Sequence, residues 1–88
     1  MIWRVEFDPD AFEELRSQDR EAQRRILRYL RERIATGADP RRFGKALRGE
    51  LAGLWRYRVG DYRLVCQIRQ TILLVLVVRV AHRSTVYE

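Results

Sequence analysis

The sequence has little cysteine, histidine or lysine, with one residue of each among 88. The single cysteine, Cys66, excludes a disulfide framework and a CxxC metal site, which is typical of a protein from a reducing compartment. The apolar run 71–78 is too short to cross a bilayer, and the N-terminal residues lack the pattern of a secretory signal. We therefore expect a cytoplasmic protein that binds no metal or other cofactor.

Because lysine is nearly absent, the positive charge is almost all arginine, which supplies 17 of the 18 basic residues. Residues 1–39 carry eight basic and nine acidic side chains, a net charge of −1. Residues 40–88 carry ten basic and three acidic side chains, a net charge of +7. This asymmetry favours a polyanionic partner, and nucleic acid before a membrane surface. A basic surface that serves only solubility is the alternative.

The chain length predicts a single domain with a modest core. Apolar and polar residues alternate over 2–7, which predicts a half-buried strand. Asp8 and Pro9 then suit the N-cap and the first position of a helix. A second helix is predicted to begin near Asp19 and to end before Gly37. Two amphipathic helices with a short connection predict an antiparallel helical hairpin.

The second half of the chain is predicted to consist of strands. Residues 40–53 show no clear periodicity and are interpreted as a connector. Alternating patterns at 55–59 and 62–69 predict two strands, and the apolar run 71–80 is typical of an interior strand covered on both faces. The order β-α-α-β-β-β indicates an α+β fold, with the helical hairpin packed on a small twisted antiparallel sheet.

Three arginines fall on one short hairpin, "WRYRVGDYRLV", around the dipeptide Gly60-Asp61. Glycine at the first turn position suits a type II′ turn, which pairs Arg58 with Arg63 and puts Arg56 on the same face. We expect Arg58 and Arg63 to face solvent. Like charges directly opposite each other are destabilising, unless an anion such as phosphate bridges the guanidinium groups. The alternative is a solvated face on which the arginines splay apart.

The segment "KALRGELAGLWRYRVGDYRLVCQI", the apolar strand after it and the C-terminal "VAHRSTVYE" resemble the RelE family of toxins from bacterial toxin–antitoxin pairs. The resemblance covers nearly the whole chain, so residues 1–88 are expected to form a single RelE-like toxin domain. It implies a ribosome-dependent endoribonuclease that cuts messenger RNA in the ribosomal A site. In that family the ribose 2′-hydroxyl attacks the adjacent phosphate, which leaves a 2′,3′-cyclic phosphate and a free 5′-hydroxyl and requires no metal.

The resemblance also implies a set of site residues. These are Arg56, Arg58, Arg63, His82, Arg83 and Tyr87. Arg63 matches the family's phosphate-binding arginine, and Arg83 and Tyr87 match the arginine and tyrosine near its C-terminus. His82 matches a histidine that many members carry.

Arg56 and Arg58 match positions that are often lysine in the family, and the difference matters chemically. A guanidinium with a pKa above about 12 cannot act as a base at neutral pH, so these arginines are interpreted as stabilisers of transition-state charge. The general base must then be His82 or Tyr87. The ordinary pKa of histidine, near 6.5, suits the role better, whereas tyrosine, near 10, needs neighbouring positive charge. Both assignments stay open.

Two other functions are compatible with this sequence. ParE-type toxins share the fold but bind DNA gyrase and cleave no RNA, and they generally lack the basic residues and the tyrosine. A non-catalytic RNA-binding domain would expose aromatic side chains for base stacking, whereas Trp55 and Tyr57 are predicted to face the core. The expected partners are a cognate antitoxin and the ribosome with its messenger RNA, with no membrane partner.

Overall fold

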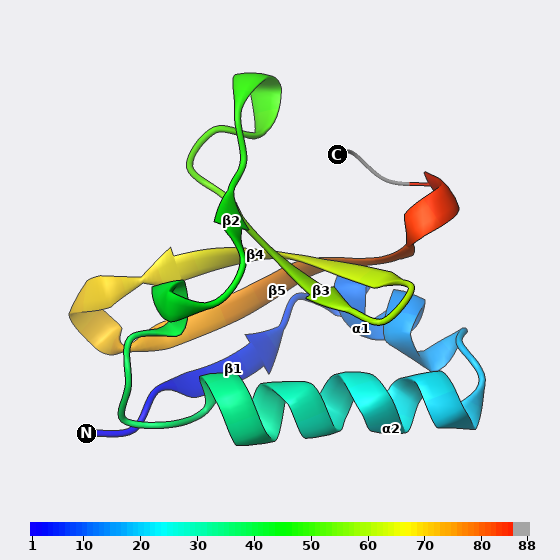
Figure 1. Cartoon of the computed structure of the whole chain (residues 1–88), viewed down its shortest axis with the longest axis horizontal. Helices are drawn as coiled ribbons and strands as arrows, with labels where there is room; N and C mark the ends of the chain where they lie inside the picture. The colour runs from blue at the N-terminus through cyan, green and yellow to red at the C-terminus, as the bar shows by residue number, and fades with distance from the viewer. Residues whose placement is uncertain (86–88) are drawn as a thin grey trace.

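The computed structural model describes residues 1–85, which form two α-helices and a five-stranded sheet (Figure 1). The helices are α1 (Pro9–Arg16) and α2 (Arg20–Tyr29), and α2 continues into a π-helical turn at Leu30–Ile34. The strands are β1 (Arg4–Phe7), β2 (Lys45–Ala46), β3 (Trp55–Val59), β4 (Tyr62–Arg69) and β5 (Leu74–His82). The predicted α+β class is confirmed. Within residues 1–85, no helix has both the length and the apolar character needed to cross a membrane.

Both helices begin at the predicted aspartates. The Asp8 carboxylate accepts a hydrogen bond from the Asp10 N–H at 3.1 Å, and Pro9 occupies the first helical position. At α2, the Asp19 carboxylate accepts from the Ala22 N–H at 2.8 Å. Because the first N–H groups of a helix have no partner within it, these side chains satisfy donors that would otherwise need water.

The sheet has the order β1-β5-β4-β3-β2 and is mixed. The predicted antiparallel sheet is therefore wrong at one pair, since β1 runs parallel to β5, from Arg4 opposite Leu74 to Phe7 opposite Val77. Periodicity indicates that a segment is a strand, but it does not specify which strand becomes its neighbour. The strand β2 lies within the predicted connector and was not predicted, because two residues are too few to show an alternating pattern.

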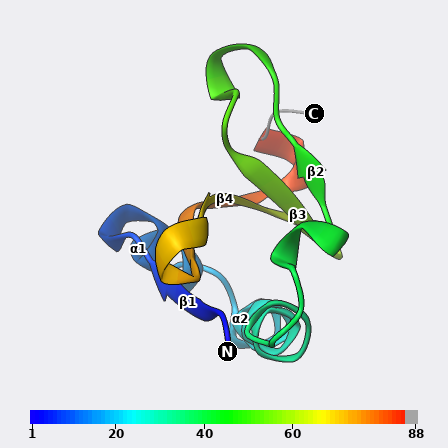
Figure 2. The same ribbon diagram turned by 90° about the vertical axis from the view of Figure 1, so that its left-hand side faces the viewer.

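The core lies on the face of the sheet that α1 and α2 cover (Figures 1 and 2). Its fully buried side chains include Ile26 of α2, Tyr57 of β3, and Leu64 and Cys66 of β4. The opposite face, here called the open face, carries no α-helix within the described part of the chain. Residues 47–54, here called the arm, rise from the β2 and β3 side of the sheet, away from α2 (Figure 2).

β5 lies between β1 and β4, as predicted for an interior strand. Its register against β4 shifts between Val65, which pairs with Arg79, and Cys66, which pairs with Val77. The extra residue in β5 is a bulge, which interrupts strict alternation and lets Val77 and Val80 both join the core. As a result, Arg79 lies on the open face.

Candidate nucleic-acid interface

The β3–β4 hairpin has the predicted register. Val59 pairs with Tyr62, and Arg58 stands directly opposite Arg63. Gly60 has a φ of +59°, whereas Asp61 does not have a positive φ. This combination fits the predicted type II′ turn, because a type I′ turn would need a positive φ at both positions.

Arg56, Arg58 and Arg63 share the open face, but only Arg58 is exposed. Arg63 is 3% exposed and Arg56 is 6% exposed, so the expectation that Arg63 faces solvent is wrong. The Arg63 guanidinium folds back onto its own turn, where Nη1 donates to the carbonyl oxygens of Gly60 and Tyr62, both at 3.1 Å. Strand alternation predicts the face on which a side chain starts, but not the course of a long side chain along the backbone.

Two basic residues that the sequence reasoning missed join the open face. Lys45 of β2 pairs with Arg56, and Arg79 of β5 pairs with Val65. Because directly paired residues share a face, these four residues form one row across the sheet. We call Lys45, Arg56, Arg58, Arg63 and Arg79 together the basic face. The sequence did contain a signal for Arg79, which is a charged residue within an otherwise apolar strand. Lys45 could be assigned to this face only once the structure showed strand β2.

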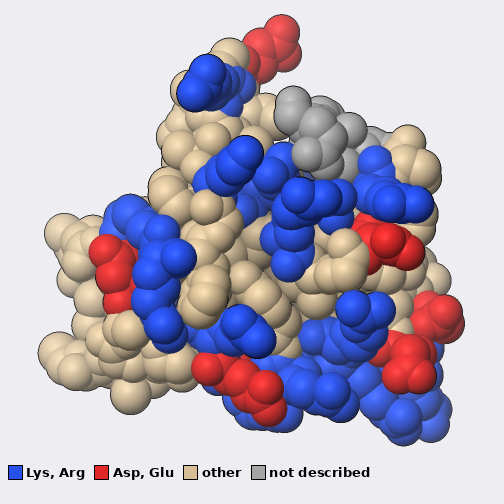
Figure 3. All heavy atoms as spheres, viewed as in Figure 1, with Lys and Arg blue, Asp and Glu red and all other residues tan. Residues whose placement is uncertain are grey.

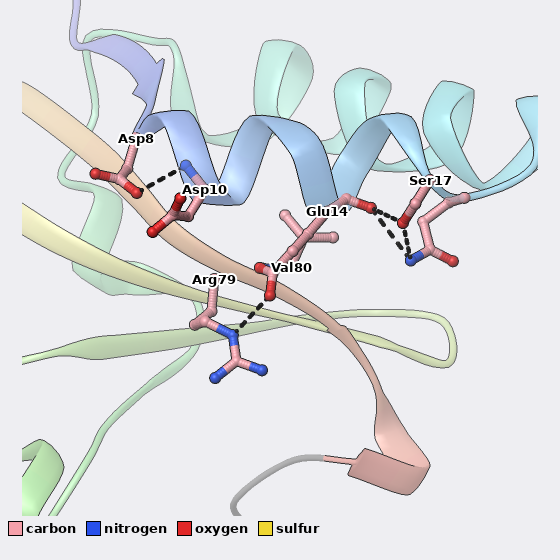
Figure 4. A network of polar contacts seen from close by, with 7 residues as sticks. Asp8, Asp10, Glu14, Ser17, Arg79 and Val80 are labelled. Carbon is pink, nitrogen blue, oxygen red and sulfur yellow. Dashed lines mark hydrogen bonds and ion pairs between the residues drawn. The ribbon is translucent and has the colours of Figure 1, made fainter.

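Arg79 is held by a carboxylate from α1. Its Nε lies 3.0 Å from Oε2 of Glu14, and the Val80 backbone N–H donates to Oε1 of the same carboxylate at 2.8 Å. β1 pairs with β5 only as far as Val77, so Glu14 takes over as the acceptor where the neighbouring strand has ended. Figure 4 shows the Arg79 guanidinium pointing away from α1.

A groove of about 640 Å³ opens between the arm and the basic face. It is lined by Lys45, Ala46, Leu47, Arg48, Leu51, Arg56 and Arg58. Figure 3 shows basic side chains gathered beside the arm as well as along α2. The cations suit phosphate oxygens, and the leucines of the arm add an apolar wall. Such a combination suits a nucleic-acid strand better than a free ion.

His82 does not join the arginines of the basic face. It pairs with Tyr62, whose side chain packs against the core, so both rings lie on the helix side of the sheet. Their ring centroids are 5.5 Å apart in an edge-to-face arrangement. The His82 Nδ1 lies 3.0 Å from the Ser84 hydroxyl and accepts from the Ser84 N–H at 3.3 Å.

Arg83 lies beside the hairpin turn. Its backbone N–H donates to the Asp61 carbonyl at 2.7 Å, and its Nε lies 3.7 Å from the Asp61 carboxylate. The side chain is 64% exposed, so the ion pair is weak and the guanidinium can exchange Asp61 for another anion. Tyr87, the last of the predicted site residues, lies outside the described residues.

Burial keeps two core groups neutral. Desolvation raises the pKa of the Cys66 thiol and of the Tyr57 phenol far above their ordinary values, and the Tyr57 hydroxyl donates to the Pro40 carbonyl at 2.8 Å. Neither group is available as a nucleophile or base at neutral pH. Within residues 1–85, no three His, Cys, Asp or Glu side chains come together in a group that would hold a metal ion.

Comparison with known families decides the class of the protein. Residues 5–87 match the family model described as the ParE toxin of the type II toxin–antitoxin system, parDE. The chain belongs to the RelE/ParE superfamily of toxins. The predicted resemblance is thereby confirmed.

Individual relatives agree with this assignment. This chain is 45% identical to Toxin RelG of Mycobacterium tuberculosis over 50 residues, which are 57% of this chain and 58% of that protein. It is similar to a chain of the toxin–antitoxin complex RelBE2 from Mycobacterium tuberculosis, with 30% identity, a TM-score of 0.86, and coverage of 96% of this chain and 94% of that one. The isolated Escherichia coli RelE toxin has the same fold, with 22% identity and a TM-score of 0.70. That match covers 91% of this chain and 83% of the Escherichia coli chain.

Proposed function

We propose that this toxin is a ribosome-dependent endoribonuclease that cleaves messenger RNA in the ribosomal A site without a metal. The observation that carries the proposal is the basic face, where five cationic side chains from four strands lie on one side of the sheet. A concentration of positive charge on one face is typical of a surface that binds a polyanion. The proposed ligand is the phosphodiester backbone of the message.

In the reaction, the ribose 2′-oxygen attacks the adjacent phosphorus and the bond from phosphorus to the 5′-oxygen breaks. A general base takes the 2′-hydroxyl proton, and the departing 5′-oxygen receives a proton. Arg58, the exposed arginine of the hairpin, donates hydrogen bonds to the phosphoryl oxygens as negative charge builds up on them. Arg56 and Arg63 are almost fully buried on the same face and add positive charge that stabilises the transition state. Arg83, whose side chain and Asp61 partner are both exposed, is the second phosphate ligand.

Tyr87 is the preferred general base. His82 lies on the helix side of the sheet, and its Nδ1 accepts a hydrogen bond from the Ser84 N–H. Both observations support the tyrosine, because a base must reach the 2′-hydroxyl of a strand bound on the basic face. A phenol acts as a base at neutral pH only where positive charge lowers its pKa, so this role requires Tyr87 to lie near the arginines of the basic face.

The ribosome supplies the alignment that a flat basic face lacks. Free single-stranded RNA rarely holds its 2′-oxygen, phosphorus and 5′-oxygen in line, and prior alignment lowers a barrier by about 7–11 kcal/mol. The second proposed partner is a cognate antitoxin, since the similar RelBE2 structure is a toxin–antitoxin complex. An antitoxin that brings acidic side chains to the groove would cover the basic face and block RNA.

The test is cleavage of one messenger RNA on purified ribosomes and free in solution, at a single salt concentration and a single Mg²⁺ concentration. Cleavage sites are mapped by primer extension, and the products are tested for a 2′,3′-cyclic phosphate. We expect rapid cleavage within the A-site codon and slow cleavage of the free RNA. Equal rates on free and ribosome-bound RNA, or products that lack a 2′,3′-cyclic phosphate, would contradict the proposal.

Inhibition of DNA gyrase is the second candidate function, because the matching family model is that of ParE toxins. The same preparation is therefore tested for inhibition of gyrase supercoiling. A toxin that blocks supercoiling and leaves ribosome-bound message intact would establish this alternative instead.

A further inference from the structure

The outer face of α2 and its π-helical extension carries a second concentration of arginine. Its exposed arginines are Arg20, Arg24, Arg25, Arg28, Arg31 and Arg33. Several are three or four residues apart, such as Arg24 and Arg28, and therefore lie next to each other on the helix surface. Like charges at this spacing each destabilise a helix by about 0.2–0.5 kcal/mol. Glu21 and Glu32 offset part of this repulsion, and Arg31 lies 3.9 Å from the Glu32 carboxylate. Six arginines against two glutamates still leave an excess of positive charge on this surface, which favours binding of an anion.

This surface is hollowed where α2 meets the tip of the β3–β4 hairpin. The depression has a volume of about 260 Å³. Its lining consists of Arg25, Arg28, Tyr29, Glu32, Arg33, Arg58, Val59 and Gly60. Four of these residues are arginines and one is acidic, so the depression is strongly cationic. Its volume exceeds that of a single phosphate group and allows a short stretch of sugar-phosphate backbone.

Gly60 brings the helix and the hairpin together at this point. A Cβ atom at residue 60 would come within 2.5 Å of the Arg25 Nη2, so the Arg25 guanidinium rests against the glycine backbone. The glycine required by the turn therefore also allows an α2 arginine to lie directly beside the hairpin tip.

Arg58 connects this depression to the groove of the basic face. Its side chain lines both the 640 Å³ groove beside the arm and the depression beside α2. The two cationic surfaces are therefore continuous, and Figure 3 shows both of them on one side of the molecule. A strand that leaves the groove past Arg58 meets Arg25 and Arg28 next.

We infer that the depression formed by α2 and the hairpin tip is a second RNA site, which binds sugar-phosphate backbone outside the scissile phosphate. RNA is favoured over an acidic protein segment because the surface continues the proposed substrate groove and its lining is mainly guanidinium. The core of a protein interface is usually apolar and depleted of charge, whereas among the described lining residues Tyr29 and Val59 are the only aromatic or large apolar ones. The inference rests on the proposed function, because it extends the RNA-binding surface proposed for the ribosome-bound toxin from the basic face to α2.

The experiment compares two double variants that remove equal charge. Arg25→Gln with Arg28→Gln alters the depression. Arg4→Gln with Arg69→Gln is the control, since both arginines are exposed and both pair with Leu74, at the end of the sheet opposite to the hairpin tip. Binding to purified 70S ribosomes is measured by sedimentation over a range of salt concentrations. Circular dichroism and thermal unfolding confirm that each variant is folded.

We expect the α2 variant to bind ribosomes about tenfold more weakly than wild type, from the loss of two exposed ion pairs. Its logarithmic salt slope should fall by about 1 to 2, because fewer counterions are released. The control should match wild type in both quantities. Equal weakening of the two variants, or wild-type binding by the α2 variant, overturns the inference.

Binding to poly-glutamate tests the other class of partner. An α2 variant that loses affinity for poly-glutamate and keeps its affinity for ribosomes assigns the surface to an acidic protein and overturns the RNA site. A different result would contradict the proposed function and leave this inference intact. If wild type binds ribosomes through α2 and leaves the message intact, the cleavage mechanism is wrong and the docking surface stands.

Discussion

Glu14 of α1 lies 3.0 Å from Arg79 of β5, and the same carboxylate accepts the Val80 N–H at 2.8 Å. One side chain thus replaces the missing neighbour strand at the edge of β5 and orients a cation of the basic face (Figure 4). Side chains 65 residues apart in the sequence are joined by this contact. Two parts of the molecule, the first helix and the proposed RNA surface, therefore depend on each other.

Glu14→Gln should lower the free energy of unfolding by about 1–2 kcal/mol. The ion pair with Arg79 is partly buried, and an amide cannot accept from two donors with the same strength as a carboxylate. Glu13→Gln is the matched control, because Glu13 pairs with Arg16 at an exposed site and its loss should change stability by less than about 0.5 kcal/mol. Urea unfolding of both variants decides the point, and equal stability losses would contradict it.

Arg58→Gln should reduce cleavage of ribosome-bound message by about 10²–10³-fold, as for the loss of one transition-state donor. Its melting temperature should not fall, because Arg58 is exposed and its removal relieves repulsion from Arg63. Arg69→Gln, on the adjoining strand and also exposed, is the control for both measurements. Wild-type cleavage by the Arg58 variant would remove the phosphate-binding role of the hairpin.

Arg63→Gln should lose activity and also stability. Its Nη1 donates to the Gly60 and Tyr62 carbonyls, and a net hydrogen bond contributes about 0.5–1.5 kcal/mol. Substitution of both hairpin arginines with alanine therefore does not test phosphate binding alone. Thermal unfolding of the two single variants, measured beside the cleavage rates, separates chemistry from folding. An Arg63 variant as stable as wild type would show that these contacts contribute little.

Tyr87→Phe keeps the aromatic ring and removes only the hydroxyl. If the phenol is the general base, cleavage should fall by about 10²-fold or more while ribosome binding is retained. His82→Gln is made in parallel, and its cleavage rate should be close to that of wild type because its ring lies on the helix side of the sheet. The reverse pattern, an active Tyr87 variant and a damaged His82 variant, would assign the base to the histidine.

Stability should decline above about pH 8.5. The Cys66 thiol is fully buried and its pKa is raised by desolvation, whereas in the unfolded chain it ionises near 8.5. Above that pH the unfolded state loses a proton that the native state keeps, so the free energy of unfolding falls by about 1.4 kcal/mol per pH unit. Urea unfolding from pH 7 to pH 10 measures the slope, and Cys66→Ala should make it shallower. An unchanged slope in that variant would exclude the thiol as its source.

Local chemistry in the sequence was enough to predict the elements that depend on neighbours along the chain. Asp8 with Pro9, and Asp19, predicted both helix starts because capping involves only a few adjacent residues. Gly60-Asp61 predicted a two-residue hairpin turn, and a turn of this length places Arg58 opposite Arg63. The family motifs in the second half of the chain predicted the class of toxin, because a motif consists only of residue types and their order.

The tertiary structure alone decided which distant segments meet. The parallel pairing of β1 with β5 depends on contacts between segments far apart in the sequence, and the short strand β2 and the bulge in β5 depend on how neighbouring strands pair. Those contacts bring Lys45 and Arg79 to the basic face and bury Arg63 against its own turn. Periodicity reports which way a side chain leaves its strand, whereas burial and pairing depend on the free energy of packing the whole chain, which no local pattern contains.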